Sequence, residues 1–406
     1  MIRRLLGNKS EERSLSFQDI WGRGLNETDV ATKSGEVVNS DTAFGVTSVY
    51  AAVRLLSDTV SNLDLSAFYR TQGIERPFRP LPTWMVRMNT NLANHEIVGQ
   101  IIVSLLIDGN AYVATLRDQT GRVINLSVLD PSDITASVDN DEGVERLTFT
   151  SSSSLGTTFT TRDITMIRGS VIKPGSIEGL SPIAAAREMI GTGLGVQKYG
   201  ASFFGNSAIP GAIIEVPGQL SSEGAAQLKA AWNDVHRSSG NSHRLAVLTE
   251  SAKFSTVSLS PEDSQWLSSR EATVQDVARI YGLPPFLLAD TSRATSWGTG
   301  LHEMNVAMVQ YSLRPLANKV SSAFTTIMRS EGIAVAFARF DVGAISRAGN
   351  ERWDTYSKGI QSGIYSINEV RSLEGMAPLP DGLGDEHYVP LNLAPVGSEA
   401  FDPSEE

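Results

Sequence analysis

The chain of 406 residues contains no cysteine and only five histidines. Without cysteine it can form neither a disulfide-bonded scaffold nor a thiolate zinc site, and this composition is typical of a protein that folds in the cytosol. Its longest uncharged apolar run, residues 97–107, is too short to cross a bilayer. The first residues lack the apolar segment of a signal peptide. We therefore expect neither a membrane span nor a leader.

An excess of basic charge is also missing. The 45 acidic residues outnumber the 34 Lys and Arg residues and give a formal net charge of −11. Tight binding of nucleic acid depends on Lys and Arg side chains that neutralise phosphates, so this charge argues against a protein that grips DNA or RNA. It is compatible with a protein past which nucleic acid slides, because a weakly attractive or repulsive wall favours sliding.

The common catalytic signatures are absent: no GxxxxGK[ST], GxSxG or HExxH occurs. The glycine run at 191–195 lacks the preceding strand of a dinucleotide-binding fold. The histidines of 236–243 do not have the helical spacing of a metal motif, and the acidic residues 139–143 do not match a calcium loop. Solvated turns explain both segments better. We therefore expect no catalytic residue, no cofactor and no metal site.

What is present is a mixed pattern that predicts an α+β chain of more than one structural unit. Apolar residues at three- and four-residue spacing predict a helix over about 47–63. The other elements expected before residue 180 are a strand at 63–70, an apolar helix from about Asn94 to 108–110, two strands around a glycine turn at 111–130, and short strands at 134–168.

A long helix is predicted over 181–204, with Pro182 in its first turn. Gly191, Gly193 and Gly195 lie in its middle, where each costs about 1 kcal/mol relative to alanine. Two structural reasons would explain them: the close approach of a second helix, or a local break in this one.

A small α/β module is expected next, at residues 207–259. It contains predicted strands at 211–216, 244–250 and 254–260, and a helix that begins at Ser221. The helix that follows has a strong start signal, because Ser260 can cap it, Pro261 occupies its first position and Asp263 its third.

The stretch ARIYGLPPFLLAD (278–290) ends that helix abruptly, because glycine is a typical C-terminal stop and proline cannot continue a helix. We interpret Gly282, Pro284 and Pro285 as a rigid elbow that fixes the direction in which the chain leaves the helix. A polar loop follows at 291–300. In it, Arg293 is either an ordinary exposed residue or a phosphate contact, and Trp297 can serve as a packing anchor.

The remainder of the chain is predicted to be largely helical. A helix over 301–330 should be kinked at Pro315, because proline removes one backbone hydrogen bond. Its apolar side is expected to comprise Leu301, Met304, Met308, Tyr311, Val320, Phe324 and Met328. Ser366 and Glu369 form the capping box of a further helix that ends at Gly375, and residues 397–406 have the composition of a disordered acidic tail.

Several of these stretches resemble the portal proteins of tailed bacteriophages, in the Hong Kong 97-like family. The similar blocks follow the family's order between about residues 44 and 380: SVYAAVRLLSDTVSNLDLSAF (48–68), IDGNAYVATLRDQTGRVINLSVLDPSDI (107–134), IEGLSPIAAAREMIGTGLGVQKYGASFFGNSAIPGAIIEVPGQLS (177–221), LSPEDSQWLSSREATVQDVARIYGLPPFLLAD (259–290) and GIYSINEVRSLEGMAPLP (363–380). One block departs from the family, because RATSWGT (293–299) replaces an ATYSN-like run.

The resemblance implies a portal fold, with a wing, two long stem helices, a small inserted α/β clip and a helical C-terminal crown. The expected divisions are an N-terminal arm (1–40), the first part of the wing (41–180), a stem helix (181–206), the clip (207–259), a second stem helix (260–283), the rest of the wing (284–344, with a tunnel loop at about 289–300), the crown (345–390) and an acidic tail (391–406). Within the tunnel loop, the residues expected to face DNA are Ser292, Arg293, Thr295, Ser296 and Trp297.

The implied function is structural: a ring, expected to have twelve subunits, at one capsid vertex, through which the genome is packaged and ejected. The expected partners are further copies of the chain, double-stranded DNA without sequence specificity, the large terminase subunit, the head–tail adaptor and the major capsid protein. The expected location is the virion, after assembly in the cytoplasm of a bacterial host. Other interpretations stay open: a different head–tail adaptor ring, a related shell protein, or a cytosolic enzyme with a pocket between its α/β units.

Overall fold

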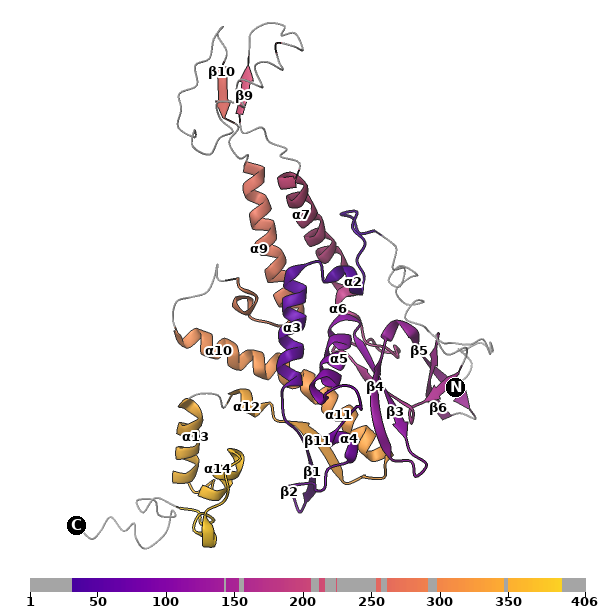
Figure 1. The fold of residues 1–406 in the computed structure, drawn as a ribbon, viewed down its shortest axis with the longest axis vertical. Coiled ribbons are helices and arrows are strands. Elements are labelled where there is room, and N and C mark those ends of the chain that lie inside the picture. Colours follow the sequence, from indigo (N-terminus) through magenta and orange to yellow (C-terminus); the bar gives the residue numbers. More distant parts are fainter. Residues whose placement is uncertain are drawn as a thin grey trace, which may run out of the picture. The chain divides into compact units, whose positions relative to one another are not determined.

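The computed structural model describes residues 31–141, 144–152, 157–205, 212–215, 224, 253–256, 261–290, 298–346 and 350–388. The chain divides into two compact units (Figure 1). Unit 1 comprises Met1–Ser57, Gln100–Ala114 and Val128–Ser296, and unit 2 comprises Asp58–Gly99, Thr115–Ser127 and Trp297–Glu406. The pairings β1–β11, β1–β2, β3–β8, β5–β6, β6–β7 and β9–β10 are all antiparallel. The predicted α+β class is confirmed.

The sheets of unit 1 surround an aromatic core. Its strands are the first half of β3 (Asn110–Arg117), β5 (Ile134–Asp141), β6 (Val144–Ser151), β7 (Thr158–Thr160) and β8 (Ile164–Arg168), with a 3₁₀ turn at Pro131–Asp133. Tyr112 and Phe149 meet edge to face with ring centroids 5.9 Å apart, and Ile134 and Ile164 complete the buried cluster. These strands confirm the short strands expected within 134–168.

The helices of unit 1 are α2 (Ser40–Ala43), most of α3 (Thr47–Ser61), the second half of α5 (Asn94–Ile107), α6 (Pro182–Ala185), α7 (Arg187–Gly205) and α9 (Pro261–Tyr281). The prediction of one continuous helix over 181–204 is wrong at Ala186, whose φ of −100° and ψ of 12° separate α6 from α7. The Ser181 hydroxyl accepts a hydrogen bond from the Ala184 amide at 3.0 Å and caps α6. The short α6 is therefore a separate, capped turn.

Between α7 and α9 the structure describes β9 (Ala212–Glu215), which pairs with β10 (Lys253–Thr256). Strand β9 falls within the predicted strand at 211–216, and β10 overlaps the first residues of the predicted strand at 254–260 but begins one residue earlier. The predicted strand at 244–250 lies outside the described residues, as does the helix expected from Ser221 apart from residue 224, which is helical.

Unit 2 has a three-stranded sheet in the order β11–β1–β2, formed by β1 (Leu65–Thr71), β2 (Ile74–Pro77) and β11 (Ala336–Phe340). The second half of β3, most of β4 (Val123–Leu129), α4 (Thr83–Val86) and the start of α5 also belong to this unit. Helix α11 (Arg314–Ser330) packs on β11. The ring of Phe324, fully buried, lies 5.6 Å from that of Trp84 and 6.2 Å from that of Phe340.

The long helix predicted over 301–330 is interrupted, but before its proline. Helix α10 (Gly298–Met308) passes through a π-helical segment (Val309–Leu313) into α11, where Pro315 occupies the first turn. A π turn holds more residues than an α turn, so the apolar register of α11 does not continue into α10. The expectation of one apolar side is therefore wrong: Phe324 is buried, whereas Tyr311 is 72% exposed and Met304 is 41% exposed.

The chain continues through α12 (Gly343–Ser346) to a helical hairpin of α13 (Asn350–Gln361) and α14 (Ile367–Leu373), followed by a 3₁₀ turn at Pro380–Gly382. The capping box predicted for Ser366 and Glu369 is confirmed. The Ser366 hydroxyl accepts from the Glu369 amide at 3.1 Å, and the Glu369 carboxylate accepts from the Ser366 amide at 2.8 Å.

Candidate functional site

Two long helices of unit 1, α7 and α9, lie side by side and antiparallel, and β9 and β10 occupy the stretch of chain between them (Figure 1). A glycine of α7 explains how closely the two helices approach each other. A Cβ atom on Gly193 would lie 3.0 Å from Cγ2 of Thr273 on α9 and 3.5 Å from Cγ2 of Val46. Helix α7 is unbroken over 187–205. Of the two reasons considered for its glycines, the close approach of a second helix is the correct one for Gly193.

A polar segment before α2 packs on the same helix. A Cβ atom on Gly191 would lie 2.5 Å from Oγ1 of Thr32, a residue that is only 5% exposed. The backbone amide of Lys33 donates to the Glu188 carboxylate at 3.2 Å. We call residues 31–38 the strap. Its packing could not be read from the sequence because residues 31–38 have no hydrophobic period. Their one local signal is the turn glycine at position 35, with φ +83°.

The strap is fixed to α7 by charge as well as by packing. The Lys198 ammonium lies 3.0 Å from the Glu36 carboxylate. Within the strap, the Thr32 hydroxyl donates to the Glu36 carbonyl at 2.8 Å. An exposed ion pair of this kind contributes about 0–1 kcal/mol, so the close fit at Gly191 is the larger constraint on its position.

The C-terminal end of α9 has the hydrogen-bond pattern of a Schellman motif. Gly282 adopts φ +65°, its amide donates to the Arg279 carbonyl at 3.4 Å, and the Leu283 amide donates to the Ala278 carbonyl at 2.8 Å. Leu283 and Ala278 are both buried, which supplies the apolar contact that accompanies this motif. The structure thus places Gly282 one residue beyond the helix.

After this stop the chain turns twice more before the loop. Pro284 is extended, with φ −61° and ψ 130°, and Pro285 opens a 3₁₀ turn that ends at Leu288. Ala289 has φ +63°, and the Asp290 amide donates to the Pro285 carbonyl at 3.2 Å. The direction of the chain from 282 to 290 is therefore set by two prolines and two left-handed residues.

Two side chains of α9 form hydrogen bonds that hold residues 281–290 in place within unit 1. The Tyr281 hydroxyl donates to the Leu106 carbonyl of α5 at 3.1 Å, and burial raises the pKa of Tyr281 above its usual value. The Gln275 amide donates to the Asp290 carboxylate at 3.2 Å. The start of the loop is thereby tied back to the helix that precedes it.

The loop itself lies beyond what the structure describes. The sequence candidates Ser292, Arg293, Thr295, Ser296 and Trp297 fall at positions 291–297, which are outside the described residues. The structure describes the two ends between which they lie, namely the 3₁₀ turn at 285–288 and the start of α10 at Gly298.

Perturbed titrating groups in the described residues are explained by structural contacts. Burial raises the pKa of Asp108, whose carboxylate accepts a 2.7 Å hydrogen bond from the Ser40 hydroxyl and so links α2 to the end of α5. Burial likewise raises the pKa of Tyr112, which donates to Glu178 at 3.0 Å. Among the described residues there is no cluster of His, Asp and Glu fit to hold a metal ion, and no helix long and apolar enough to cross a membrane.

Comparison with known proteins assigns this architecture to a family. The family model described as "Phage portal protein" matches residues 47–375. The chain belongs to the phage portal protein family. It is 42% identical over 378 residues to a "Probable portal protein" of Streptomyces phage phiC31, covering 90% of this chain and 82% of that protein. It is 25% identical to the "Portal protein" of Enterobacteria phage HK97, covering 87% and 85%.

Solved structures agree at the level of the fold. A chain from the virion of a native gene transfer agent particle matches with a TM-score of 0.65 at 21% identity, over 83% of this chain and 92% of that one. A chain from the neck of a native gene transfer agent particle, computed with C12 symmetry, matches with a TM-score of 0.62 at 19% identity, over 84% and 96%. Proteins of the portal family have a structural role, so this chain is a portal protein and not an enzyme.

Proposed function

We propose that copies of this portal protein form a ring at one capsid vertex, whose central channel carries the genome during packaging and ejection. The observation that carries this proposal is the family match across 47–375, which includes the antiparallel pair α7–α9 and the segment inserted between them. A closed ring joins two different patches of neighbouring subunits, so a single chain suffices to build it. The neck structure with C12 symmetry supports twelve as the number of copies.

In this proposal α7 and α9 are the stem helices and residues 207–259 are the clip. Residues 41–180 and 284–344 form the wing, and residues 345–390 form the crown. The clip receives the large terminase subunit during packaging and a head–tail adaptor afterwards, and the wing meets the major capsid protein. The net charge of −11 suits a channel that must not hold phosphates tightly, because each stable phosphate contact would have to be broken as DNA moves.

The loop at about 289–300 is proposed as the tunnel loop, with Arg293 making brief phosphate contacts. The elbow of Gly282, Pro284 and Pro285 supports this role, because it fixes the chain direction up to residue 290. Arg293→Glu in an infectious clone should alter the packaging efficiency or the length of packaged DNA, with Arg122→Glu as a charge-matched control on another turn. Unchanged packaging and titre would contradict a role for Arg293 in contacting DNA in the channel.

The ring itself is tested on the purified chain. A subunit has a mass of 43.7 kDa, so light scattering distinguishes a monomer from a ring of about twelve copies without ambiguity. Negative-stain images should show rings with a central hole. A stable monomer under all assembly conditions, or a closed particle without a hole, would contradict the proposal.

A further inference from the structure

One face of the sheet in unit 2 carries both arginine and phenylalanine side chains. The register pairs Phe68 with Phe337 and Arg70 with Glu75, and it places Arg339 opposite Ser66. Cross-strand partners lie on the same side of a sheet, so all of these side chains share one face. We call Ser66, Phe68, Arg70, Glu75, Phe337 and Arg339 the arginine face. Ala67, Ala338 and Phe340 on the opposite face are buried.

The side chains of the arginine face hold one another in place. The Glu75 carboxylate binds the Arg70 guanidinium at 2.7 Å and the Arg339 guanidinium at 2.7 Å. Hydrogen bonds from these two arginines keep the pKa of Glu75 below its usual value. The Arg339 guanidinium also lies 4.2 Å from the centre of the Phe68 ring and 5.8 Å from that of Phe337. Ordered arginines and aromatic rings are the residues enriched in protein interfaces, because little side-chain entropy is lost when a partner binds.

The net charge of this face is positive, in contrast to the chain as a whole. It carries the guanidiniums of Arg70 and Arg339 and the single carboxylate of Glu75, two positive charges against one negative, a net charge of +1. A partner for the face should therefore offer both carboxylates and apolar side chains.

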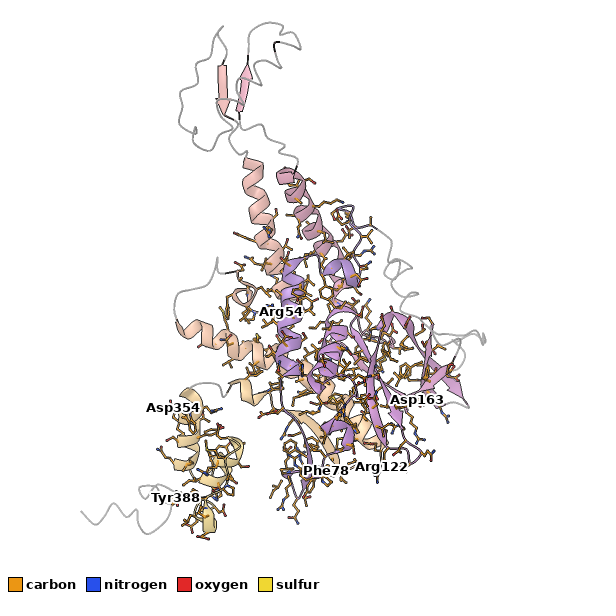
Figure 2. All side chains as sticks on the ribbon, in the orientation of Figure 1. Arg54, Phe78, Arg122, Asp163, Asp354 and Tyr388 are labelled. Atoms are coloured by element: carbon orange, nitrogen blue, oxygen red, sulfur yellow. The ribbon has the colours of Figure 1, made fainter. Side chains whose placement is uncertain are left out.

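The hairpin of α13 and α14 has this chemistry. We call residues 350–388 the C-terminal module. It contains seven acidic residues (351, 354, 369, 374, 381, 385 and 386) and three Arg or Lys residues (352, 358 and 371), a net charge of −4. Its large exposed apolar side chains are Trp353, Ile364, Leu373, Met376, Leu383 and Tyr388, whereas the buried ones are Tyr356 and Val370. Asp354 and Tyr388 are labelled in Figure 2.

The module is a defined body that can present this surface. Glu374 accepts hydrogen bonds from Tyr356 at 2.8 Å and from Arg352 at 2.9 Å. Asn368 donates to Asp385 at 2.7 Å and accepts from the Leu379 amide at 2.7 Å. These contacts fix the chain after α14 against the helix. Six large apolar side chains remain at its surface, which is more than its own interior contains.

We propose that the arginine face of one subunit binds the C-terminal module of the adjacent copy in the ring. The inference rests on the proposed ring, because a closed ring requires two different, complementary patches on every chain. The two patches complement each other in charge, one basic and one acidic, and both carry aromatic or aliphatic anchors. Double-stranded DNA is a less suitable partner for the arginine face, because the Glu75 carboxylate would repel phosphates. The exposed apolar side chains of the C-terminal module would also remain without a partner.

The absence of cysteine from the chain makes this pairing directly measurable. Ser66→Cys places a thiol on the arginine face, and Asp354→Cys, Leu373→Cys and Leu383→Cys place one on α13, on α14 or after it. Each module variant is co-assembled with the separate Ser66→Cys chain and treated with a short bismaleimide. At least one pair should give covalent dimers on a denaturing gel, while each variant assembled alone should give none. Absence of dimers from all three pairs, in preparations that form rings, overturns the inference and leaves the ring intact.

A second measurement uses charge. The double variant Arg70→Gln and Arg339→Gln should raise the subunit concentration at half-assembly about tenfold, because it removes both guanidiniums from the interface. Arg122→Gln, an exposed arginine on the β3–β4 turn, is the matched control and should leave assembly unchanged. An unchanged far-ultraviolet circular dichroism spectrum shows that the double variant is folded.

Two other experimental outcomes would show that the arginine face binds something other than the module of the adjacent copy. If the double variant assembles normally but its rings lose salt-dependent binding of double-stranded DNA, the face contacts phosphates and the proposal is wrong. If a chain carrying both Ser66→Cys and a module cysteine crosslinks only within itself, the module covers its own sheet and the proposal is also wrong. Failure of every variant, including the cysteine-free parent, to form rings would count against the proposed function instead.

Discussion

Alanine at position 191 and alanine at position 195 should change the stability of the chain in opposite directions. Both glycines lie in the interior of α7, where replacement by alanine favours the helix by about 1 kcal/mol. The two sites differ in the space around the new methyl group. At Gly195 the nearest atom is Cβ of Ser34 at 3.7 Å, an ordinary contact, so Gly195→Ala should stabilise the protein by about 1 kcal/mol.

At Gly191 there is no such space. A new Cβ atom would lie 2.5, 2.7 and 2.9 Å from Oγ1, Cγ2 and Cβ of Thr32, so the whole threonine side chain must move. Its hydroxyl bonds the Glu36 carbonyl at 2.8 Å and the Ser34 hydroxyl at 2.8 Å. Overpacking costs about 1–3 kcal/mol and each lost hydrogen bond about 1 kcal/mol. With one hydrogen bond lost these costs exceed the gain in helix propensity, so Gly191→Ala should destabilise the protein by about 1–3 kcal/mol.

The assay combines thermal unfolding with hydrogen exchange on the same preparations. Gly191→Ala should lower the midpoint and speed amide exchange in the strap, at Thr32 and at the Gly35 amide, which donates to the Thr32 carbonyl at 2.8 Å. Gly195→Ala should raise the midpoint and leave exchange in the strap unchanged. If Gly191→Ala is as stable as Gly195→Ala, with full protection of the strap, the close packing of residues 31–38 on α7 is refuted.

Three further predictions concern other parts of the chain. Gly282→Ala should destabilise the end of α9 by about 1 kcal/mol, because alanine is strained at φ +65°, and faster amide exchange at Leu283 would report it. Glu331→Gln should cost about 1–3 kcal/mol, because the Trp84 indole and the Val123 amide each donate at 2.7 Å to a different carboxylate oxygen, and in glutamine an NH2 group would face one of these donors. An unchanged unfolding midpoint would contradict this. Hydrogen bonds from two arginines lower the pKa of Glu75 in the folded protein. The stability that Glu75 contributes is therefore fully present above the pKa of the unfolded state and is lost as the pH falls through the pKa of the folded state. An NMR titration of the carboxylate should show the lowered pKa, and Glu75→Gln should abolish this pH dependence of stability.

The elements that the sequence predicted well are those whose signals are local. The start of α9 at Pro261, its stop at Gly282 and the capping box of α14 depend on neighbouring residues alone, and the structure shows α9 over Pro261–Tyr281 and α14 from Ile367. The glycines of α7 were different. Their composition indicated either a break or a close contact, and only the positions of Thr32 and Thr273 decide between them.

Other features depend on tertiary packing and were missed or misplaced. The strap has no hydrophobic period, so its burial against α7 could not be read from its own residues. Pro315 predicted an interruption, but the interruption is a π segment that precedes the proline and shifts the apolar register, and Tyr311 is exposed. For the proposed site, the elbow residues could be found from the sequence, whereas any subunit interface depends on a second copy of the chain.

The central claim is a ring of this chain at a single capsid vertex. Gold labelling of an epitope tag at the C-terminus, imaged on assembled particles, measures this directly. The account predicts label at one vertex of each particle, coincident with the tail where a tail is attached. Label at every vertex, over the whole shell, or along the tail would contradict it.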